Sequence, residues 1–396
     1  MARQALEMAD IVRAHGAAFA ASRSGRVSGA ESRVLHAVTV CRTAALGAHI
    51  DACDECGHEV ITYNSCRNRH CPKCQASAAF AWLADRQSEL LPVEYFHVVF
   101  TVPREVAAIA MQNTRVVYNA LFRSSWETLR EIAADPKHLG AQIGTLSILH
   151  TWGQTLEHHP HIHCVVPGGG ISPDGKRWVP CKPGFFLPVR VLSRLFRRKL
   201  LEALGRSFDA GDLRFYGSLA HLEDPSNFWA YLRPLRGKDW MVYAKPPFGS
   251  PDCVLKYLAR YTHRVAISNH RLLRMQDDKV TFAWKDYAHA SRRKTMTLSA
   301  VEFIRRFLLH VLPRGFVRIR HQGFLANRTR REKVALCREL LAAEDRAPPV
   351  VLSPTAPPEH PPPVCPECKK GRLVLVRRLS PRELAYALPV TIHDTS

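Results

Sequence analysis

Two cysteine pairs of the form Cys-x-x-Cys constrain this chain more than any other feature of its sequence. They are CDEC at 53–56 and CPKC at 71–74. Each Cys-x-x-Cys turn lets two thiolates face one ion, and tetrahedral zinc takes four such ligands. The sequence therefore predicts a structural zinc ion, and its expected ligands are Cys53, Cys56, Cys71 and Cys74.

Six of the twelve cysteines of the chain lie between residues 41 and 74, so the two pairs belong to a larger cluster. In a large chain without a secretion signal, thiols stay reduced, and clustered cysteines indicate metal sites rather than disulfides. The spacing leaves open whether a second zinc ion binds here. Its candidate ligands are Cys41, Cys66 and His70, with His36, His49 and His58 nearby.

The chain is strongly basic, with 56 Lys+Arg against 35 Asp+Glu and a formal net charge of +21. This balance indicates a polyanionic partner, and nucleic acid is the leading candidate. Arg67 and Arg69 lie between the two cysteine pairs, where basic residues on a zinc-stabilised turn are well placed to contact phosphates. The alternative is a solvated basic loop on a purely structural module.

Segments that would enter or cross a membrane are not evident in the sequence. No uninterrupted apolar run reaches ~18 residues. The first residues, MARQALEMADIVRAHG, carry acidic side chains and lack the apolar core of a signal peptide. We therefore expect a cytoplasmic protein without a membrane partner, associated with the nucleoid when it binds DNA.

Strand and helix patterns alternate between about residues 95 and 320. The strand candidates are YFHVVFTVP (95–103), IGTLSILHTW (143–152) and HIHCVVPGGG (161–170), and segments of helical period separate and follow them. This alternation predicts an α+β fold, with an antiparallel sheet flanked by helices and a small N-terminal zinc module.

Composition suggests how this fold divides along the chain. A proline-rich stretch, APPVVLSPTAPPEHPPP, has the composition of a linker. The CPEC pair after it offers only two thiolates, so it reads as a degenerate zinc ribbon or a half-site. The expected parts are a zinc module with flanking helices at 1–92, a sheet domain at 93–320, a basic helical segment at 321–346, the linker at 347–363 and a C-terminal tail at 364–396.

The stretch HHPHIHC, which begins at residue 158, holds four histidines within six residues. Suppose that 143–151 and 160–168 form antiparallel strands with the turn centred between residues 155 and 156. His150 then lies opposite His161, with His163 on the same face, because side chains alternate along a strand. The first two histidines of the run fall in the loop.

Two or three neutral imidazoles with open positions beside them suit a divalent ion that must also bind substrate oxygens. His161 and His163 are the first candidates, and the hairpin adds His150. Gln154 is a reserve ligand if the register differs. The alternative is a set of strand histidines with a structural role.

The stretch from Gly170 to Lys176 has the spacing of a phosphate-binding P-loop, but two features argue against one. Arg177 follows the lysine where a P-loop has serine or threonine, and a proline interrupts the loop. A Gly-Lys turn between strands fits better. We therefore expect no nucleotide partner.

The segment YLARYTHR (257–264) places Tyr257 and Tyr261 one helical turn apart on one face. A tyrosine hydroxyl has a pKa near ~10 and needs cations or a metal, and a positioned phosphate, to act as a nucleophile. The alternative is that both rings merely pack the helix. The cations that recur on an adjoining face are Lys256, Arg260 and Arg264.

Together these motifs resemble the rolling-circle transposases of the "ninety-one" family of bacterial insertion sequences, which are two-tyrosine members of the HUH endonuclease superfamily. The resemblance rests on stretches that occur in order and span about residues 41–335. They are SCRNRHCPKCQ, YFHVVFTVP, LHTWGQTLEHHPHIHCVVPGGG, YLARYTHRVAISNHR and GFLANRTRREK.

The resemblance implies that His161 and His163 hold Mg²⁺ or Mn²⁺ against a scissile phosphate, with His150 as the third ligand that the hairpin suggests. It also implies that Tyr257 or Tyr261 attacks single-stranded DNA at the ends of the element and at the target. The products would be a 5′-phosphotyrosine and a free 3′-OH. Which tyrosine attacks first stays open, since some relatives use only one.

Two other functions fit parts of the sequence. A plasmid rolling-circle replication initiator or relaxase would use the same chemistry, although the zinc module favours a transposase. A non-catalytic zinc-dependent DNA-binding protein would keep the histidines and tyrosines for structural reasons.

Overall fold

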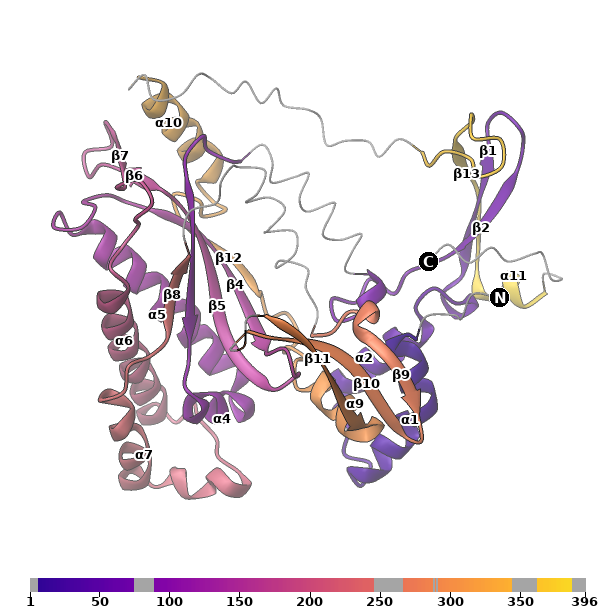
Figure 1. Cartoon of the computed structure of the whole chain (residues 1–396), viewed down its shortest axis with the longest axis horizontal. Helices are drawn as coiled ribbons and strands as arrows, with labels where there is room; N and C mark the ends of the chain where they lie inside the picture. The colour runs from indigo at the N-terminus through magenta and orange to yellow at the C-terminus, as the bar shows by residue number, and fades with distance from the viewer. Residues whose placement is uncertain are drawn as a thin grey trace. The chain divides into compact units, whose positions relative to one another are not determined.

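The computed structural model describes residues 6–74, 89–245, 266–287, 289, 291–343 and 362–386 (Figure 1). The chain divides into two compact units, each of which gathers segments that are distant in the sequence. The cysteine unit comprises Met1–Ala84, His263–Val311 and Pro354–Ser396, and the histidine unit comprises Asp85–Thr262 and Leu312–Ser353. The division expected from the sequence followed chain order instead.

The histidine unit contains a five-stranded sheet in the order β12-β4-β5-β3-β8, and every neighbouring pair is antiparallel. The antiparallel sheet expected from the sequence is therefore present. Its strands are β3 (Tyr95–Thr101), β4 (Gly144–Trp152), β5 (His158–Pro167), β8 (Val242–Lys245) and β12 (Ile319–Gly323).

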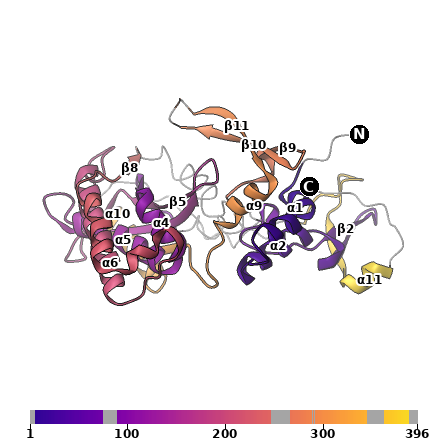
Figure 2. The ribbon, with the colours of Figure 1, turned by 90° about the horizontal axis from the view of Figure 1, so that it is seen from below.

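Helices pack against one face of this sheet (Figures 1 and 2). Alternate strand residues such as Phe100, Leu149 and Ile162 are buried in the core with Leu121 and Phe196. Because side chains alternate along each strand, the residues between them lie on the opposite face. In the described part of this unit the helices are α4 (Arg104–Gln112), α5 (Thr114–Ala134), α6 (Val189–Asp209), α7 (Pro225–Leu232) and α10 (Arg330–Ala343).

Strand β12 was not expected from the sequence. The expected division between the sheet domain and the basic helical segment, at residues 320 and 321, falls within this strand. Its residues, IRHQG, contain a single β-branched side chain and no apolar alternation. The strand lies at the edge of the sheet, where only one neighbour pairs with it. A short polar edge strand gives a weak sequence signal for this reason.

A short hairpin joins β6 (Gly169–Ile171) to β7 (Trp178–Pro180). The Gly-Lys sequence lies in its turn, as expected, where the Ser172 hydroxyl accepts a hydrogen bond from the Arg177 backbone N–H. A second small core forms here, because Ile171 and Trp178 pack with residues of α10.

The cysteine unit contains helices α1 (Met8–Ser22), α2 (Gly29–Val40) and α9 (Ala300–Leu308), with α1 in contact with both others (Figure 2). Ser299 is the N-cap of α9, because its hydroxyl accepts a hydrogen bond from the Glu302 backbone N–H at 3.3 Å. Hydrogen bonds from Arg305 and Arg306 lower the pKa of Glu302 to about 2. The helix ends at Leu308, with Arg305 and Arg306 in its last turn.

Two three-stranded sheets complete the cysteine unit, in the orders β13-β1-β2 and β11-β10-β9. Strands β10 and β11 pair as an antiparallel hairpin. The elements are β1 (Ala48–Cys53), β2 (Glu59–Tyr63), β9 (Leu272–Gln276), β10 (Lys279–Asp286), β11 (Arg292–Ser299), β13 (Leu373–Leu379) and α11 (Pro381–Tyr386). The 3₁₀ turns among the described residues are η1 (Ala44–Leu46), η2 (Gly217–Glu223), η3 (Arg233–Arg236) and η4 (Asn269–Arg271). Within the described ranges no helix is both long and apolar enough to cross a membrane.

Candidate active site and metal centres

Three histidines converge on the sheet face opposite the one that carries Phe100, Leu149 and Ile162. His150 of β4 lies directly opposite His161 of β5, and His163 lies two residues further along the same face. One ring nitrogen from each residue lies within 4.8 Å of the others. The register inferred from the hairpin turn is therefore confirmed.

Two of the three imidazoles in the cluster are buried, and the third is partly exposed. The exposed fraction is 3% for His150 and 7% for His163, whereas His161 is only partly buried. Three imidazoles can hold a divalent ion and leave coordination positions for oxygen atoms of a substrate.

Hydrogen bonds fix how two of these rings present their nitrogens. The Nδ1 of His161 lies 2.6 Å from the carbonyl oxygen of His159, which can only accept, so the proton is on Nδ1 and the lone pair on Nε2. The Nδ1 of His163 lies 2.8 Å from the Nε2 of His97. When His163 donates in that bond, its own Nε2 carries the lone pair that a metal takes.

His97 was missed by the sequence analysis. It lies in β3, within YFHVVFTVP, and its exposed fraction is 1%. Its ring is nearly parallel to that of His163, with the centroids 5.0 Å apart. The available signal was its odd-numbered position in the strand, which places it on the face opposite the apolar Phe96 and Val98.

The sequence predicted that His158 and His159 lie in the loop, and this prediction is wrong. Both residues belong to β5, which begins at His158. The turn is tighter, and Leu156 adopts a positive φ of 63° within it. The His158 ring lies on the helix-covered face, where its Nε2 is 2.8 Å from the Tyr118 hydroxyl. Burial lowers the pKa of His158 to about 4, so it is neutral at physiological pH.

The cysteines form two groups of four, and within each the sulfurs lie within 4.8 Å of one another. The expected single site of Cys53 and Cys56 with the 71–74 pair is not what the structure shows. One group is Cys41, Cys66, Cys71 and Cys74, and the other is Cys53, Cys56, Cys365 and Cys368. His70 belongs to neither group.

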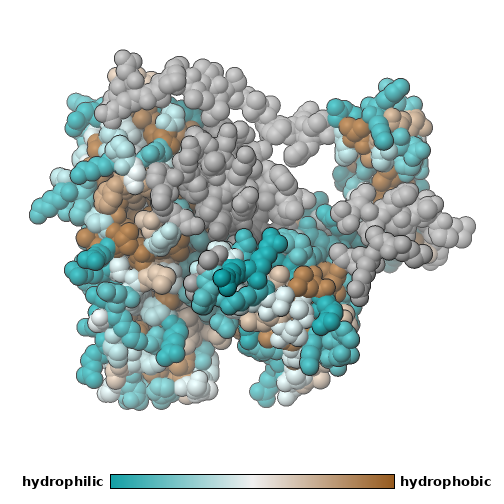
Figure 3. All heavy atoms as spheres, viewed as in Figure 1, coloured by the Kyte–Doolittle hydropathy of each residue, from teal (hydrophilic) through white to brown (hydrophobic). Residues whose placement is uncertain are grey.

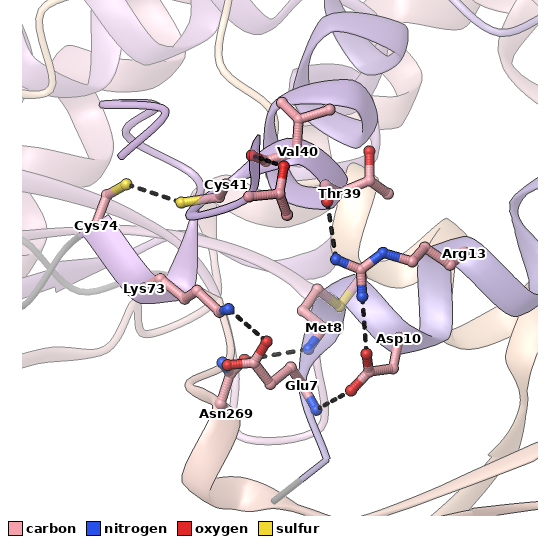
Figure 4. Close-up of polar contacts among 11 residues, drawn as sticks. Glu7, Met8, Asp10, Arg13, Thr39, Val40, Cys41, Lys73, Cys74 and Asn269 are labelled. Atoms are coloured by element: carbon pink, nitrogen blue, oxygen red, sulfur yellow. Dashed lines mark hydrogen bonds and ion pairs between the residues drawn. The ribbon is translucent and has the colours of Figure 1, made fainter. Parts of the chain in front are cut away.

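Figure 4 shows Cys41 and Cys74 of the first group pointing toward each other, with their sulfurs 3.5 Å apart. Cys66 lies at the same distance from Cys74. An ion pair of 2.6 Å between Lys73 and Glu7 joins this group to the start of α1 (Figure 4). Spacing identified the pairs correctly but could not tell which thiols complete each site, because Cys-x-x-Cys fixes only two ligands.

The structure describes only some of the other expected site residues. Tyr257, Tyr261 and the cations Lys256, Arg260 and Arg264 lie outside the described residues. Arg67 is exposed next to the first cysteine group and adopts a positive φ of 52°. Arg69 is partly buried, and this burial lowers the pKa of its guanidinium group.

Comparison with known families gives two matches. The family described as "Transposase zinc-binding domain", defined for IS91-type elements, matches residues 11–102. The family described as "Putative transposase" matches residues 144–333.

Two relatives match over most of their length. A protein of Sinorhizobium fredii named "Putative transposase y4qJ" is 56% identical over 383 residues, which cover 95% of this chain and 96% of the relative. The transposase of insertion sequence IS801 from Pseudomonas savastanoi pv. phaseolicola is 27% identical over 305 residues, or 75% and 71% of the two chains. The chain belongs to the IS91 family of rolling-circle transposases.

Among solved structures, the transposase is similar to the conjugative relaxase TrwC in complex with oriT DNA, in a metal-free form. The TM-score is 0.26 and the identity 18%, over 44% of this chain and 68% of that one. A second TrwC complex, with a 27-mer DNA that includes the recognition hairpin and the cleavage site, gives a TM-score of 0.24, 17% identity and coverage of 43% and 66%.

The zinc-binding domain of the transposase contains all four cysteines of the first group and two of the second. These thiol clusters and the family match together support structural zinc. The remaining two thiols, Cys365 and Cys368, lie far beyond the matched residues.

Proposed function

We propose that this transposase cleaves and rejoins single-stranded DNA through a tyrosine nucleophile, at the ends of its element and at the target. The observation that carries the proposal is the convergence of His150, His161 and His163 on one patch of the sheet. Mg²⁺ or Mn²⁺ would be held there by the three imidazoles and would stabilise negative charge on the scissile phosphate. Phosphate oxygens and waters in the remaining positions are the hard ligands that these ions prefer.

The nucleophile in this proposal is the hydroxyl of Tyr257 or Tyr261. Its oxygen attacks the phosphorus and loses its proton, and the bond from phosphorus to the 3′-oxygen breaks. The 3′-oxygen leaves and takes up a proton, so a 5′-phosphotyrosine and a free 3′-OH remain. The covalent bond conserves the energy needed for rejoining, and a second tyrosine could process the next end or the target.

Basic residues would hold the DNA strand. Lys256, Arg260 and Arg264 lie on the tyrosine segment, and Arg67 and Arg69 are beside the first cysteine group. Figure 3 shows strongly hydrophilic residues over the β10–β11 hairpin, and the exposed cations there include Arg292, Arg293 and Lys294. Such contacts release counterions, so we expect DNA affinity to fall steeply with salt.

A cavity of about 420 Å³ lies along the edge strand β12. Its lining includes Arg115, Arg320 and His321, with the Asn119 side chain accepting a hydrogen bond from Arg320. The positively charged and amide groups suit a phosphate-bearing strand. The proposed activity would take place on DNA in the cytoplasm, at the nucleoid.

The proposal is tested by incubating the full chain with labelled single-stranded DNA that carries an end of the element, with and without Mn²⁺ or Mg²⁺. Denaturing gels should show a protein–DNA band that requires the ion. If the protein binds this DNA but forms no covalent band with either end, it acts as a non-catalytic DNA-binding protein. If it releases cut DNA without a covalent band, water rather than tyrosine is the nucleophile.

Replacing His97 with alanine should lower the rate of adduct formation by about 10–100-fold, the usual cost of losing a group that orients a metal ligand. His97 is a positioning residue here, because it contacts the His163 ring rather than the DNA. The same variant should need more Mn²⁺ for half-maximal rate. His97→Gln, which keeps an acceptor near the position of Nε2, should recover part of the loss. A lower yield of active protein with an unchanged Mn²⁺ requirement would instead indicate a packing role.

A further inference from the structure

The second cysteine group brings the Cys53–Cys56 pair of the N-terminal module together with the Cys365–Cys368 pair of the C-terminal tail. The sulfurs of Cys53 and Cys368 lie 3.6 Å apart, and those of Cys56 and Cys365 lie 3.8 Å apart. These distances are too long for a disulfide of ~2.05 Å. They match the ~3.8 Å edge of a tetrahedron whose sulfurs each lie ~2.3 Å from a central zinc ion.

Both cysteine pairs of this group lie in turns, in which the Gly57 N–H donates to the Cys53 carbonyl and the Lys369 N–H to the Cys365 carbonyl, each at 3.0 Å. The Cys56 backbone N–H lies 3.5 Å from the sulfur of Cys53, and the Gly371 N–H donates to the sulfur of Cys368 at 3.3 Å. Each pair is followed at once by a residue with positive φ, which is Gly57 at 71° and Lys369 at 56°. Backbone N–H groups that point at sulfur stabilise the thiolate form that zinc requires.

The turns also fit into each other closely. The Asp54 N–H donates to the Arg372 carbonyl at 3.1 Å, and the Arg372 N–H donates to the Asp54 carboxylate at 2.7 Å. Gly371 does not have a positive φ, yet an added Cβ there would collide with the sulfur of Cys53. Glycine is required at this position by the approach of the opposite turn rather than by the backbone.

Strand pairing alone contributes little stability to the attachment of the C-terminal tail. Strand β13 pairs with β1 from Cys53–Leu373 to Ala48–Leu379. Most of its side chains are exposed, however, including Val374, Leu375 and Val376, and hydrophobic residues are visible on this module in Figure 3. The pairing buries little apolar surface and closes a very long loop, which costs chain entropy. An ion at the cysteines would supply the missing stabilisation.

We propose that Cys53, Cys56, Cys365 and Cys368 bind a second structural zinc ion, which attaches the C-terminal tail to the N-terminal module. The tail then provides half of a metal site and one strand of a three-stranded sheet. The CPEC pair is thus a half-site, one of the two alternatives that the sequence left open, and not a degenerate ribbon. This inference stands on the cysteine geometry and does not depend on the strand-transfer chemistry.

Zinc content of the full chain tests the site. Wild type should contain two zinc ions per chain, and the Cys365→Ser/Cys368→Ser variant should contain one, because the group around Cys74 stays intact. Cys181→Ser is the matched control, since this thiol belongs to neither group, and it should keep two ions. One ion in wild type, or two in the double variant, would overturn the proposal.

A second experiment leaves every cysteine in place, so it does not depend on how the serine variant folds. A protease site inserted between residues 347 and 361 is cleaved in the zinc-loaded full chain. The tail fragment should remain bound during gel filtration and separate only after a strong chelator is added. Separation of the tail from the zinc-loaded protein before chelation would show that no ion holds it.

Discussion

Replacing both Tyr257 and Tyr261 with phenylalanine should abolish the covalent protein–DNA adduct while DNA binding changes by no more than a few-fold. Phenylalanine keeps the ring and its packing but removes the hydroxyl that the proposed reaction needs. Removing the nucleophile from a covalent catalyst costs at least about 10⁴-fold in rate. The measurement is a denaturing gel of Mn²⁺ reactions, with affinity for the same DNA measured separately.

The single variants show which of the two hydroxyls attacks first. If one tyrosine always attacks first, Tyr257→Phe and Tyr261→Phe will differ by orders of magnitude on a single-end substrate. The second hydroxyl should matter only when a second strand must be cleaved. Tyr216→Phe is the matched control, because this tyrosine is 62% exposed and lies outside both the tyrosine segment and the histidine cluster. An adduct that survives in the double variant would identify a different nucleophile.

The histidine cluster was predictable because its information is local. A short turn between two apolar segments set the register, and the alternation of side chains then placed His150 opposite His161. The prediction held although the turn itself was tighter than expected, because the pairing needed only the position of the turn centre. His97 was harder to predict, since it comes from a strand more than sixty residues away whose neighbour could not be deduced from spacing.

The cysteine sites show where the sequence stopped being sufficient. The Cys-x-x-Cys pairs were identified, but the spacing favoured joining the two nearest pairs around one ion. In the structure Cys53 and Cys56 meet Cys365 and Cys368 instead. No local pattern specifies a partner some three hundred residues away, because such a contact is decided by the whole chain. The edge strand β12 was missed for a related reason, since its polar sequence acquires its conformation from β4.

Replacing His161 and His163 together with alanine should lower adduct formation by roughly 10²–10⁴-fold at any Mn²⁺ concentration. The two side chains supply most of the ligand cluster, and His150 alone cannot hold an ion against water. DNA affinity should stay within a few-fold, because basic side chains rather than imidazoles contact the phosphates in the proposal. Adduct yield is measured against Mn²⁺ concentration for wild type and variant on the same oligonucleotide.

His158→Gln is the control for this experiment, because His158 is in the same strand but its ring packs against Tyr118 on the opposite face. Its adduct yield and Mn²⁺ dependence should match wild type within a few-fold. Zinc content should be the same in all three proteins, since the thiol groups lie in the other unit. A His161/His163 variant that still forms adduct with the wild-type Mn²⁺ dependence would remove the metal role from the cluster and leave its three imidazoles as structural residues of the sheet.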